Sequence, residues 1–380
     1  MEGCLRLIDD MPADWREGAF LGRLLLPEGP TPVALRGGEL FDISATAPTT
    51  AQAVAGGDAA SLTGARLGAL DDLDLSDSST LPRLLSPLDL QCVKASGVTF
   101  AVSAVERVIE ERARGDAGAA QTIRTALADR VGADLSAVKP GSTEASALKA
   151  VLIEEGLWSQ YLEVAIGKDA EIFTKAPVLA SVGWGDLVGV RSDSVWNNPE
   201  PEVVLVCDPA GRAVGAALGN DVNLRDIEGR SALLLGKAKD NNASAAVGPR
   251  IRLFDDTFGI EDVRDAVVSL KVAGDDGFEM SGQSSMRLIS RDPLDLAAQT
   301  LSSAHQYPDG FALYLGTMFA PTDDRDAPGQ GFTHKPGDEV CVSSPKLGVL
   351  RNRVASCEDA PPWTFGIASL MTNLAGRGLL

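Results

Sequence analysis

Two glutamates stand on either side of a proline just before an aliphatic strand, in the segment NNPEPEVVLV (197–206). Because successive side chains of a strand alternate between its faces, Glu200 and Glu202 project to the same side, about 7 Å apart at Cα. Pro201 cannot donate a ladder hydrogen bond, which places the pair at a strand start or edge. Two carboxylates that converge on one point repel each other unless a cation neutralises them. The pair therefore indicates either a solvated strand end or a site for a positive ion.

A third carboxylate ends the next predicted strand, AVGAALGND (213–221). Asp221 could reach the same point as the glutamates, although Gly-Asn-Asp is also an ordinary turn. Oxygen donors of this kind suit Mg²⁺, Mn²⁺ or Ca²⁺ better than zinc. Lys237 and Lys239 follow in LLLGKAKDNNASAAVGP (233–249). They either offer positive charge to an anionic substrate or form an ordinary lysine pair on the surface.

The composition limits the classes of partner. The formal net charge of −19 over 380 residues disfavours binding to nucleic acid or to an anionic membrane surface. No apolar run approaches the roughly 20 residues of a membrane helix, and the acidic start MEGCLRLIDD does not resemble a signal peptide. Five scattered cysteines without a CxxC pair indicate reduced thiols, so we expect a cytoplasmic protein.

The elements that must position these residues begin with a predicted hairpin. PVALRGGELFDIS (32–44) indicates two short strands joined at Gly37-Gly38, because glycine supplies the positive φ angles of a tight turn. Residues 45–90 are polar and aperiodic, which predicts surface loops that lead to a domain boundary. We therefore expect a small N-terminal domain over residues 1–85.

The remainder, residues 86–380, is expected to form one larger domain. Apolar residues recur at helical spacing in AVERVIEERARG (104–115), and helical pattern continues to about residue 165. Short strands separated by Gly, Pro, Asn and Asp then predominate, which indicates an α+β, β-rich protein. The predicted strands are VLASVG (178–183), LVGVRS (187–192), EVVLVCD (202–208), AVGAALG (213–219), RIRLFD (250–255), AVVSLKVAG (266–274), FALYLGTMFA (311–320) and EVCVSS (339–344).

Three motifs in this order resemble the fumarylacetoacetate hydrolase superfamily. They are PEPE (199–202), GNDVNLRDIEGR (219–230) and a lysine followed by VGP (247–249). The resemblance extends through FALYLGTMFAP and HKPGDEVCVSSPKLGVLRNRV and covers about residues 90–380. Within the superfamily, residues 97–117 and 170–202 are most similar to the 2-keto-3-deoxy-pentonate dehydratases. The resemblance implies that the larger domain is a mixed β-roll catalytic domain of the fumarylacetoacetate hydrolase type.

The resemblance also implies roles for particular residues. Glu200, Glu202 and Asp221 match the metal ligands, with Mg²⁺ as the expected ion and Mn²⁺ or Ca²⁺ as alternatives. Lys239 keeps the motif's spacing to VGP and matches a lysine that contacts the substrate and takes part in catalysis. Thr317, in LGTMFAP, matches the threonine that meets the substrate carboxylate.

Two further glutamates matter for the type of reaction. Glu171 matches a glutamate that handles protons in the dehydratase branch, and Glu106 matches the glutamate of the first active-site helix. The helical pattern alone would make Glu106 a solvated residue. Hydrolases of the superfamily usually carry a histidine three residues before that glutamate, where this chain has Ser103, which we expect to contact the substrate. The only histidines, His305 and His334, lie outside the motif, which favours dehydration.

The resemblance therefore predicts metal-dependent dehydration of a 2-keto-3-deoxy-pentonate, first of all the D-xylonate or D-arabinonate derivative, to 2,5-dioxopentanoate. This reaction would belong to oxidative pentose catabolism. An acylpyruvate or 2,4-diketo acid hydrolase on the same fold is the first alternative, and a non-catalytic keto-acid-binding protein is the second. The expected partner is the small sugar acid, with no nucleic acid and no membrane. The superfamily also implies a homodimer or homotetramer.

Overall fold

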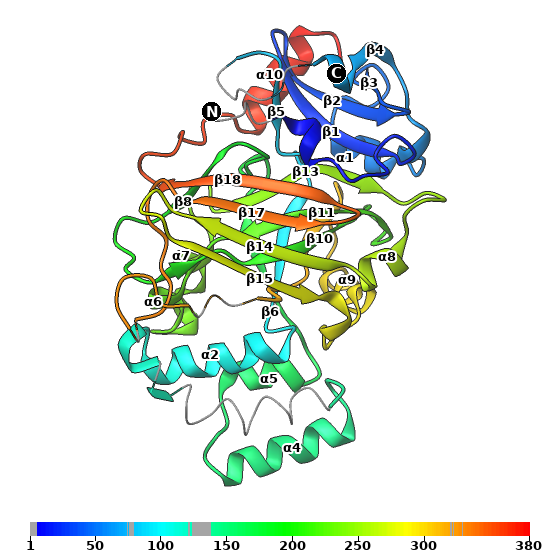
Figure 1. The fold of residues 1–380 in the computed structure, drawn as a ribbon. Helices are drawn as coiled ribbons and strands as arrows, with labels where there is room; N and C mark the ends of the chain where they lie inside the picture. The colour runs from blue at the N-terminus through cyan, green and yellow to red at the C-terminus, as the bar shows by residue number, and fades with distance from the viewer. Residues whose placement is uncertain are drawn as a thin grey trace.

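The computed structural model describes residues 6–73, 75, 80–120, 122–123, 138–319, 321, 323–328 and 330–380. Within these residues the strands form one sheet of 11 strands, one of five strands and a two-stranded ribbon (Figure 1). The 11-stranded sheet consists of β1 (Phe20–Leu26), β2 (Gly29–Arg36), β3 (Glu39–Asp42), β4 (Ala65–Ala69), β5 (Arg83–Leu85), β6 (Cys92–Gly97), β7 (Glu171–Ala176), β10 (Pro201–Cys207), β11 (Ala213–Asp221), β13 (Ala245–Leu253) and β16 (Phe311–Tyr314).

The remaining elements flank or cover this sheet. The five-stranded sheet consists of β8 (Leu187–Val190), β14 (Val267–Ala273), β15 (Glu279–Ser285), β17 (Glu339–Ser344) and β18 (Gly348–Ser356), and the ribbon of β9 (Asn197–Asn198) and β12 (Asn223–Leu224). The α-helices are α1 (Thr50–Ala55), α2 (Ala101–Ala113), α4 (Thr143–Glu154), α5 (Gln160–Ile166), α6 (Arg225–Glu228), α7 (Leu235–Lys239), α8 (Ile260–Arg264), α9 (Pro293–Thr300) and α10 (Ile367–Gly376). Short 3₁₀ turns occupy Leu7–Asp10, Ala59–Ser61, Leu70–Asp72, Ala232–Leu234 and Met286–Leu288.

The larger sheet runs from the N-terminal strands into the centre of the molecule, in the order β4-β3-β2-β1-β13-β11-β10-β16-β6-β7, with β5 paired to β1. Strand β1 pairs with β13, where Phe20 lies opposite Arg252, so the N-terminal strands continue the same sheet. Figure 1 shows these strands at one end of the molecule together with α10, and α2, α4 and α5 at the other end. The division into domains 1–85 and 86–380 stays a prediction.

Strand β10 is buried on both faces. Val203 and Leu205 point into a core that the five-stranded sheet shares, whereas Val204 and Val206 point into a second core that includes residues of α1 and β7. A strand covered on both sides needs apolar residues at every position, which explains the uninterrupted run VVLV. This burial holds the start of β10, and with it the PEPE motif, firmly in the middle of the fold.

Several sequence predictions of local structure are confirmed, beginning with the β-rich character of the chain. The hairpin of β2 and β3 turns at Gly37 and Gly38, whose φ angles are +55° and +85°. The prediction of loops throughout 45–90 is wrong, because α1, β4 and β5 lie there. Thr49 begins α1 by accepting a hydrogen bond from the Gln52 N–H at 3.0 Å, a capping signal that the polar composition concealed.

Two predicted strands are shorter than expected or absent. Residues 178–183 form only a single bridge, between Val182 and Ala246, because Leu179 adopts a positive φ of 65° that interrupts extended backbone. The strand predicted at 311–320 ends at Tyr314, shortly before Gly316 turns the chain with a φ of +101°. That turn brings residues 317–319 of the LGTMFAP motif out of the sheet.

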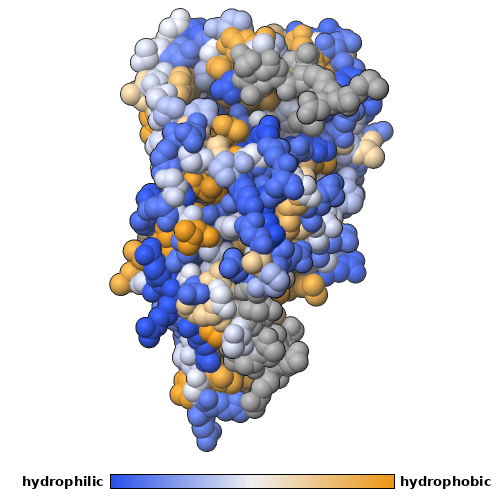
Figure 2. Space-filling model, turned by 60° about the vertical axis from the view of Figure 1, so that its left-hand side comes forward, coloured by the Kyte–Doolittle hydropathy of each residue, from blue (hydrophilic) through white to orange (hydrophobic). Residues whose placement is uncertain are grey.

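Hydrophilic and hydrophobic residues are interspersed on the face drawn in Figure 2. Among the described residues, no helix is both long enough and apolar enough to cross a membrane.

Candidate active site

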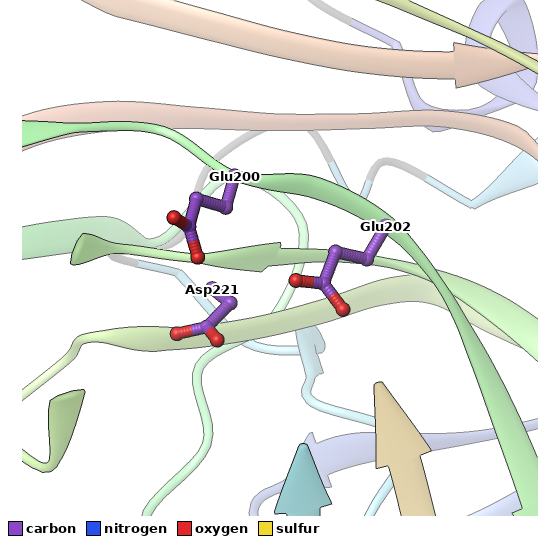
Figure 3. A group of neighbouring side chains, drawn as sticks. All are labelled: Glu200, Glu202 and Asp221. Atoms are coloured by element: carbon purple, nitrogen blue, oxygen red, sulfur yellow. The ribbon is translucent and has the colours of Figure 1, made fainter. Parts of the chain in front are cut away.

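Three carboxylates meet where β10 and β11 lie side by side (Figure 3). The Asp221 N–H donates to the Glu200 carbonyl at 3.0 Å, which holds the two strand ends in register. One carboxylate oxygen from each of Glu200, Glu202 and Asp221 lies within 4.8 Å of the others. The three residues are only 3%, 1% and 2% exposed, so the interpretation as a solvated strand end is wrong. The sequence expectation that these side chains converge is confirmed.

A glycine makes the convergence possible. Gly219 lies opposite Glu202 in the β10–β11 ladder. A Cβ atom at position 219 would lie 2.4 Å from a ring atom of Tyr314 and 2.6 Å from a methyl of Val204. Any side chain there would have to displace this packing, and with it the strand that carries Glu202.

Two buried lysines approach the carboxylates. The Lys239 ammonium contacts Glu200 Oε2 and, at 3.1 Å, Asp221 Oδ2. The Lys175 ammonium lies 2.7 Å from Asp221 Oδ1 and donates to the carbonyls of Val222, at 3.0 Å, and of Lys239. The two members of the predicted lysine pair thus differ in environment. Lys237 is on the surface, whereas Lys239 is 3% exposed.

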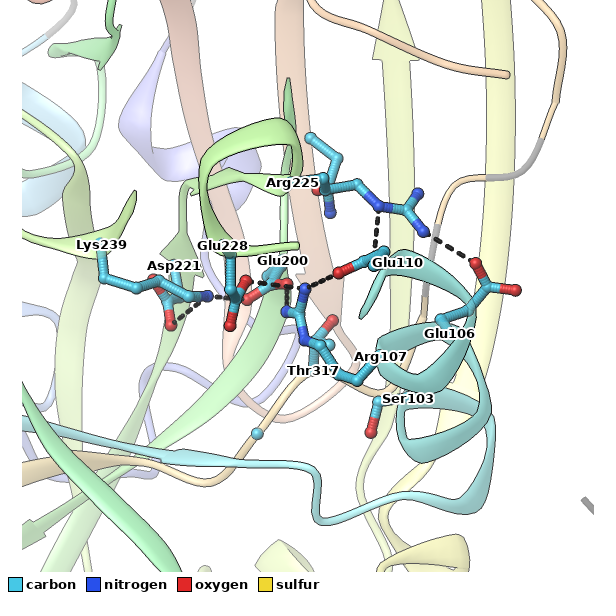
Figure 4. Close-up of polar contacts among 12 residues, drawn as sticks. Ser103, Glu106, Arg107, Glu110, Glu200, Asp221, Arg225, Glu228, Lys239 and Thr317 are labelled. Carbon is cyan, nitrogen blue, oxygen red and sulfur yellow. Dashed lines mark hydrogen bonds and ion pairs between the residues drawn. The ribbon is translucent and has the colours of Figure 1, made fainter. Parts of the chain in front are cut away.

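Arg107, on α2, contacts three carboxylates at once (Figure 4). Its Nη2 lies 2.5 Å from Glu200 Oε1. Its Nη1 lies 2.6 Å from Glu110 Oε2 and 2.7 Å from Glu228 Oε2. Five N–H donors in a planar fork allow a guanidinium to serve several acceptors in this way. Helix α2 is therefore anchored directly to a residue of the three-carboxylate site.

Glu106 lies one position away on α2 but has a different neighbour. Its carboxylate lies 2.7 Å from Nη2 of Arg225, whose Nε is 2.6 Å from Glu110 Oε1. In Figure 4 this pair lies on the far side of Arg107 from Asp221. Glu106 is 6% exposed, so the interpretation as a solvated helix residue is wrong.

The candidate active site is a small pocket at the three carboxylates, which the surrounding side chains largely fill. The described residues that line it include most of the predicted site residues and exclude Glu106. The polar and charged residues that the site uses are Ser103, Arg107, Glu171, Glu200, Glu202, Asp221, Glu228, Lys239 and Thr317, and Ser96, Gly97, Val98 and Phe173 complete the lining.

Glu171 is placed in the pocket by the pairing of β7 with β6. It lies opposite Gly97, and a Cβ atom there would be 2.0 Å from Glu171 Oε2. The absence of a side chain at Gly97 thus leaves the space that the Glu171 carboxylate fills. Burial raises the pKa of Glu171, although Arg107 and Lys239 oppose the shift. Such a carboxyl group is suited to exchange protons.

The two hydroxyl residues of the pocket are engaged locally. Ser103 Oγ donates to the Phe100 carbonyl at 2.8 Å and accepts the Phe100 N–H at 3.3 Å, so it closes the first turn of α2. Thr317 Oγ1 donates to the Phe319 carbonyl at 2.9 Å. Both residues line the pocket, and neither hydroxyl contacts the three carboxylates through these bonds.

Positive charge is distributed unevenly over the site. Burial opposes ionisation of Asp221, but Lys175 and Lys239 outweigh it and lower the pKa of Asp221. Burial, with Asp221 and Glu200 nearby, raises the pKa of Glu202 well above its usual value. Within the described residues no Lys or Arg forms an ion pair with Glu202, which accepts the Gly316 N–H at 2.7 Å. Of the three carboxyl groups, Glu202 is therefore the one whose negative charge the described side chains compensate least.

This arrangement fits a hard divalent cation. The donors are three buried carboxylates, and additional positive charge would relieve the repulsion among them. Glu228 adds a fourth carboxyl group to the pocket, and burial raises its pKa to about 7.

Sequence reasoning missed Arg107, Lys175 and Glu228. Arg107 follows Ser103 by four residues, a helical spacing that places both on one face. Lys175 follows Glu171 by four residues, which strand alternation also places on one face. Glu228 lies inside the GNDVNLRDIEGR motif. These spacings are signals, but they do not reveal which partner each side chain meets.

Comparisons with known proteins agree with the resemblance. No protein-family model matches the chain. A protein of Haloferax volcanii named probable 2-keto-3-deoxyxylonate dehydratase is 29% identical over 205 residues, which cover 53% of this chain and 66% of that protein. The 2-dehydro-3-deoxy-D-arabinonate dehydratase of Saccharolobus solfataricus is 32% identical over 155 residues, 41% of this chain and 51% of that protein. The matches thus span less than two thirds of either relative.

A solved structure extends the comparison to the whole fold. 2-Keto-3-deoxy-D-arabinonate dehydratase, complexed with magnesium and 2,5-dioxopentanoate, matches with a TM-score of 0.63 and 21% identity over 88% of this chain and 98% of that one. At this identity the match concerns the fold alone. The resemblance read from the motifs is confirmed: the chain is homologous to 2-keto-3-deoxy-pentonate dehydratases and has the fold of the solved enzyme.

Proposed function

We propose that the chain is a Mg²⁺-dependent hydro-lyase that converts a 2-keto-3-deoxy-pentonate into 2,5-dioxopentanoate. The observation that carries the proposal is the convergence of three buried carboxylates in a pocket that also contains Glu171 and Lys239. The names of the two sequence relatives and the magnesium and 2,5-dioxopentanoate bound to the structural relative support the same reaction.

Glu200, Glu202 and Asp221 would hold the cation. When bound, a divalent ion acts as a Lewis acid and stabilises negative charge on an oxygen of the substrate. Mn²⁺ and Ca²⁺ accept the same oxygen donors and remain alternatives to Mg²⁺. Lys175 keeps Asp221 ionised, so that its oxygens can bind the cation, and the Gly316 N–H orients the carboxylate of Glu202.

Glu171 is the proposed proton-transfer residue. It takes a proton from C3 of the substrate, and the C4–O bond breaks as the hydroxyl group leaves with a proton as water. A proton then moves from C5 to C3, and the resulting C4–C5 enol tautomerises to the C5 aldehyde. One water is lost in total. Lys239 supplies positive charge to the substrate, and Thr317 supplies a hydroxyl donor for its carboxylate.

Glu106 is the second candidate for proton transfer. It ranks below Glu171 because its carboxylate is paired with Arg225 and does not line the pocket. Ser103 stays a proposed substrate contact on the strength of its place in the pocket. We also retain the predictions of a cytoplasmic location and of a homodimer or homotetramer.

The hydrolase alternative lacks its usual dyad here. Ser103 occupies the position of the histidine, and neither His305 nor His334 is among the described residues that line the pocket. His334 is buried with its Nδ1 3.2 Å from Asp338, and His305 stacks on Tyr307. These positions favour dehydration over C–C hydrolysis.

An assay with synthetic D- and L-2-keto-3-deoxy-pentonates tests the proposal. We expect 2,5-dioxopentanoate to form from one stereoisomer, activity to disappear with EDTA, and Mg²⁺ to restore it. Pyruvate formed from an acylpyruvate would indicate the hydrolase instead. Saturable binding of the sugar acid without any product would indicate a non-catalytic binding protein.

A further inference from the structure

Arg107 holds a position that suggests more than a structural role. Its side chain is 9% exposed and lines the pocket. Nη1 is held by Glu110 at 2.6 Å and by Glu228 at 2.7 Å, whereas Nη2 contacts Glu200 at 2.5 Å. Because Nη1 is held from both α2 and α6, the guanidinium can keep its orientation while the partner of Nη2 changes.

Binding of a cation would create such a change. In this structure Arg107 engages Glu200 Oε1 and Lys239 engages Glu200 Oε2, so both oxygens already face positive groups. A divalent ion on Glu200 would bring a third positive group to the same carboxylate. Like charges repel strongly in a site with little water. An anionic ligand that enters beside the ion would relieve this repulsion. It would also accept hydrogen bonds from the Arg107 N–H groups that no longer bond to Glu200.

We propose that Arg107 binds the carboxylate of the substrate, with Nη1 remaining on Glu110 and Glu228 while Nη2 exchanges Glu200 for the ligand. A hydrogen bond from Nη2 to a carboxylate is charge-assisted, and the contacts of Nη1 hold the planar guanidinium in place for it. The inference rests on the proposed function, because it takes a 2-keto acid as the ligand. It adds a rule of specificity: the pocket requires an acid, since a neutral 2-keto compound leaves the guanidinium without its new partner.

Calorimetry on the full-length protein tests the inference without any turnover. The probes are Mg²⁺ alone, and then pyruvate or its neutral amide, pyruvamide, in the presence of saturating Mg²⁺. Wild-type protein is expected to bind pyruvate and not pyruvamide. Arg107→Met should weaken pyruvate binding by about 10- to 100-fold, the range for a hydrogen bond to a charged group. The same variant should bind Mg²⁺ at least as tightly as wild type, because a competitor for Glu200 is gone.

Two variants complete the test. Arg107→Lys keeps a charge but loses the planar guanidinium, so its pyruvate affinity should fall between those of wild type and Arg107→Met. It replaces Arg107→Met in the test if the methionine variant does not fold. Arg112→Met is the matched control, because Arg112 is exposed on the same helix and, among the described residues, donates to the Gly156 carbonyl at 3.2 Å and to no carboxylate. It should leave both affinities unchanged.

Unchanged pyruvate affinity in Arg107→Met would overturn the inference. So would equal binding of pyruvate and pyruvamide by wild type, or a joint loss of Mg²⁺ and pyruvate binding, which would indicate a structural role. Absence of dehydratase turnover with these binding results intact would refute the proposed function and leave the role of Arg107 standing.

Discussion

Replacement of Lys175 by methionine should destabilise the fold severely. The side chain is 0% exposed, and its ammonium lies 2.7 Å from Asp221 and 3.0 Å from the Val222 carbonyl. Methionine fills a similar volume, so the change removes charge and hydrogen bonds with little change in packing. The negative charge of Asp221 then loses one of its two lysine partners, and the buried carbonyls of Val222 and Lys239 lose a hydrogen-bond donor. Removal of one partner of a buried ion pair typically costs about 3–5 kcal/mol, and we expect a loss in free energy of unfolding in that range.

Denaturant unfolding in EDTA, followed by circular dichroism at a fixed protein concentration, measures this loss. Lys237→Met is the matched control, because the Lys237 side chain is 41% exposed and pairs with Asp193 at 3.1 Å on the surface. Such exposed pairs contribute about 0–1 kcal/mol. The double variant Lys175→Met/Asp221→Asn should recover part of the loss, since the carboxylate no longer carries an uncompensated charge.

Similar losses in Lys175→Met and Lys237→Met would refute the reasoning. That result would mean that the buried Lys175 ammonium contributes no more to the free energy of unfolding than a solvated one does. It would also mean that Asp221 does not depend on Lys175 to stay ionised.

The remaining predictions concern the site and the assembly. Glu202→Gln should weaken Mg²⁺ binding in calorimetry by at least about tenfold without altering the circular dichroism spectrum, and wild-type affinity would contradict its assignment as a ligand. Because the pKa of Glu202 is raised, Mg²⁺ must displace a proton there, so wild-type affinity should increase with pH; a constant affinity from pH 5 to 9 would count against this. Glu171→Gln should lower kcat by about 10²- to 10⁴-fold and leave Mg²⁺ affinity nearly unchanged, and normal turnover would transfer the proton-handling role to Glu106. Ser103→His should not produce efficient release of pyruvate from acylpyruvates, because the residues around position 103 are not organised for that reaction. Sedimentation should show at least a dimer, and a species of about 40 kDa alone at micromolar concentration would contradict this prediction.

The sequence by itself determined the features that depend on near neighbours in the chain. Period-two alternation put Glu200 and Glu202 on one face, and the pair of glycines at 37–38 determined the first hairpin. The ordered motifs indicated the homology and the carboxylate set. These inferences succeeded because strand geometry and turn conformation are imposed locally by the backbone.

Only the tertiary structure decided which charges meet in the pocket. Arg107 and Glu200 are 93 positions apart, and the way α2 packs against the sheet brings Arg107, and not Glu106, into contact with Glu200. The same holds for Lys175 and Asp221, whose ion pair depends on how β7 lies relative to the end of β11. The local pattern predicted that charged residues such as Glu106 are exposed to solvent, because a charge without a partner is stable in water. Burial becomes possible only when distant segments supply the opposite charge, and that supply is a property of the assembled fold.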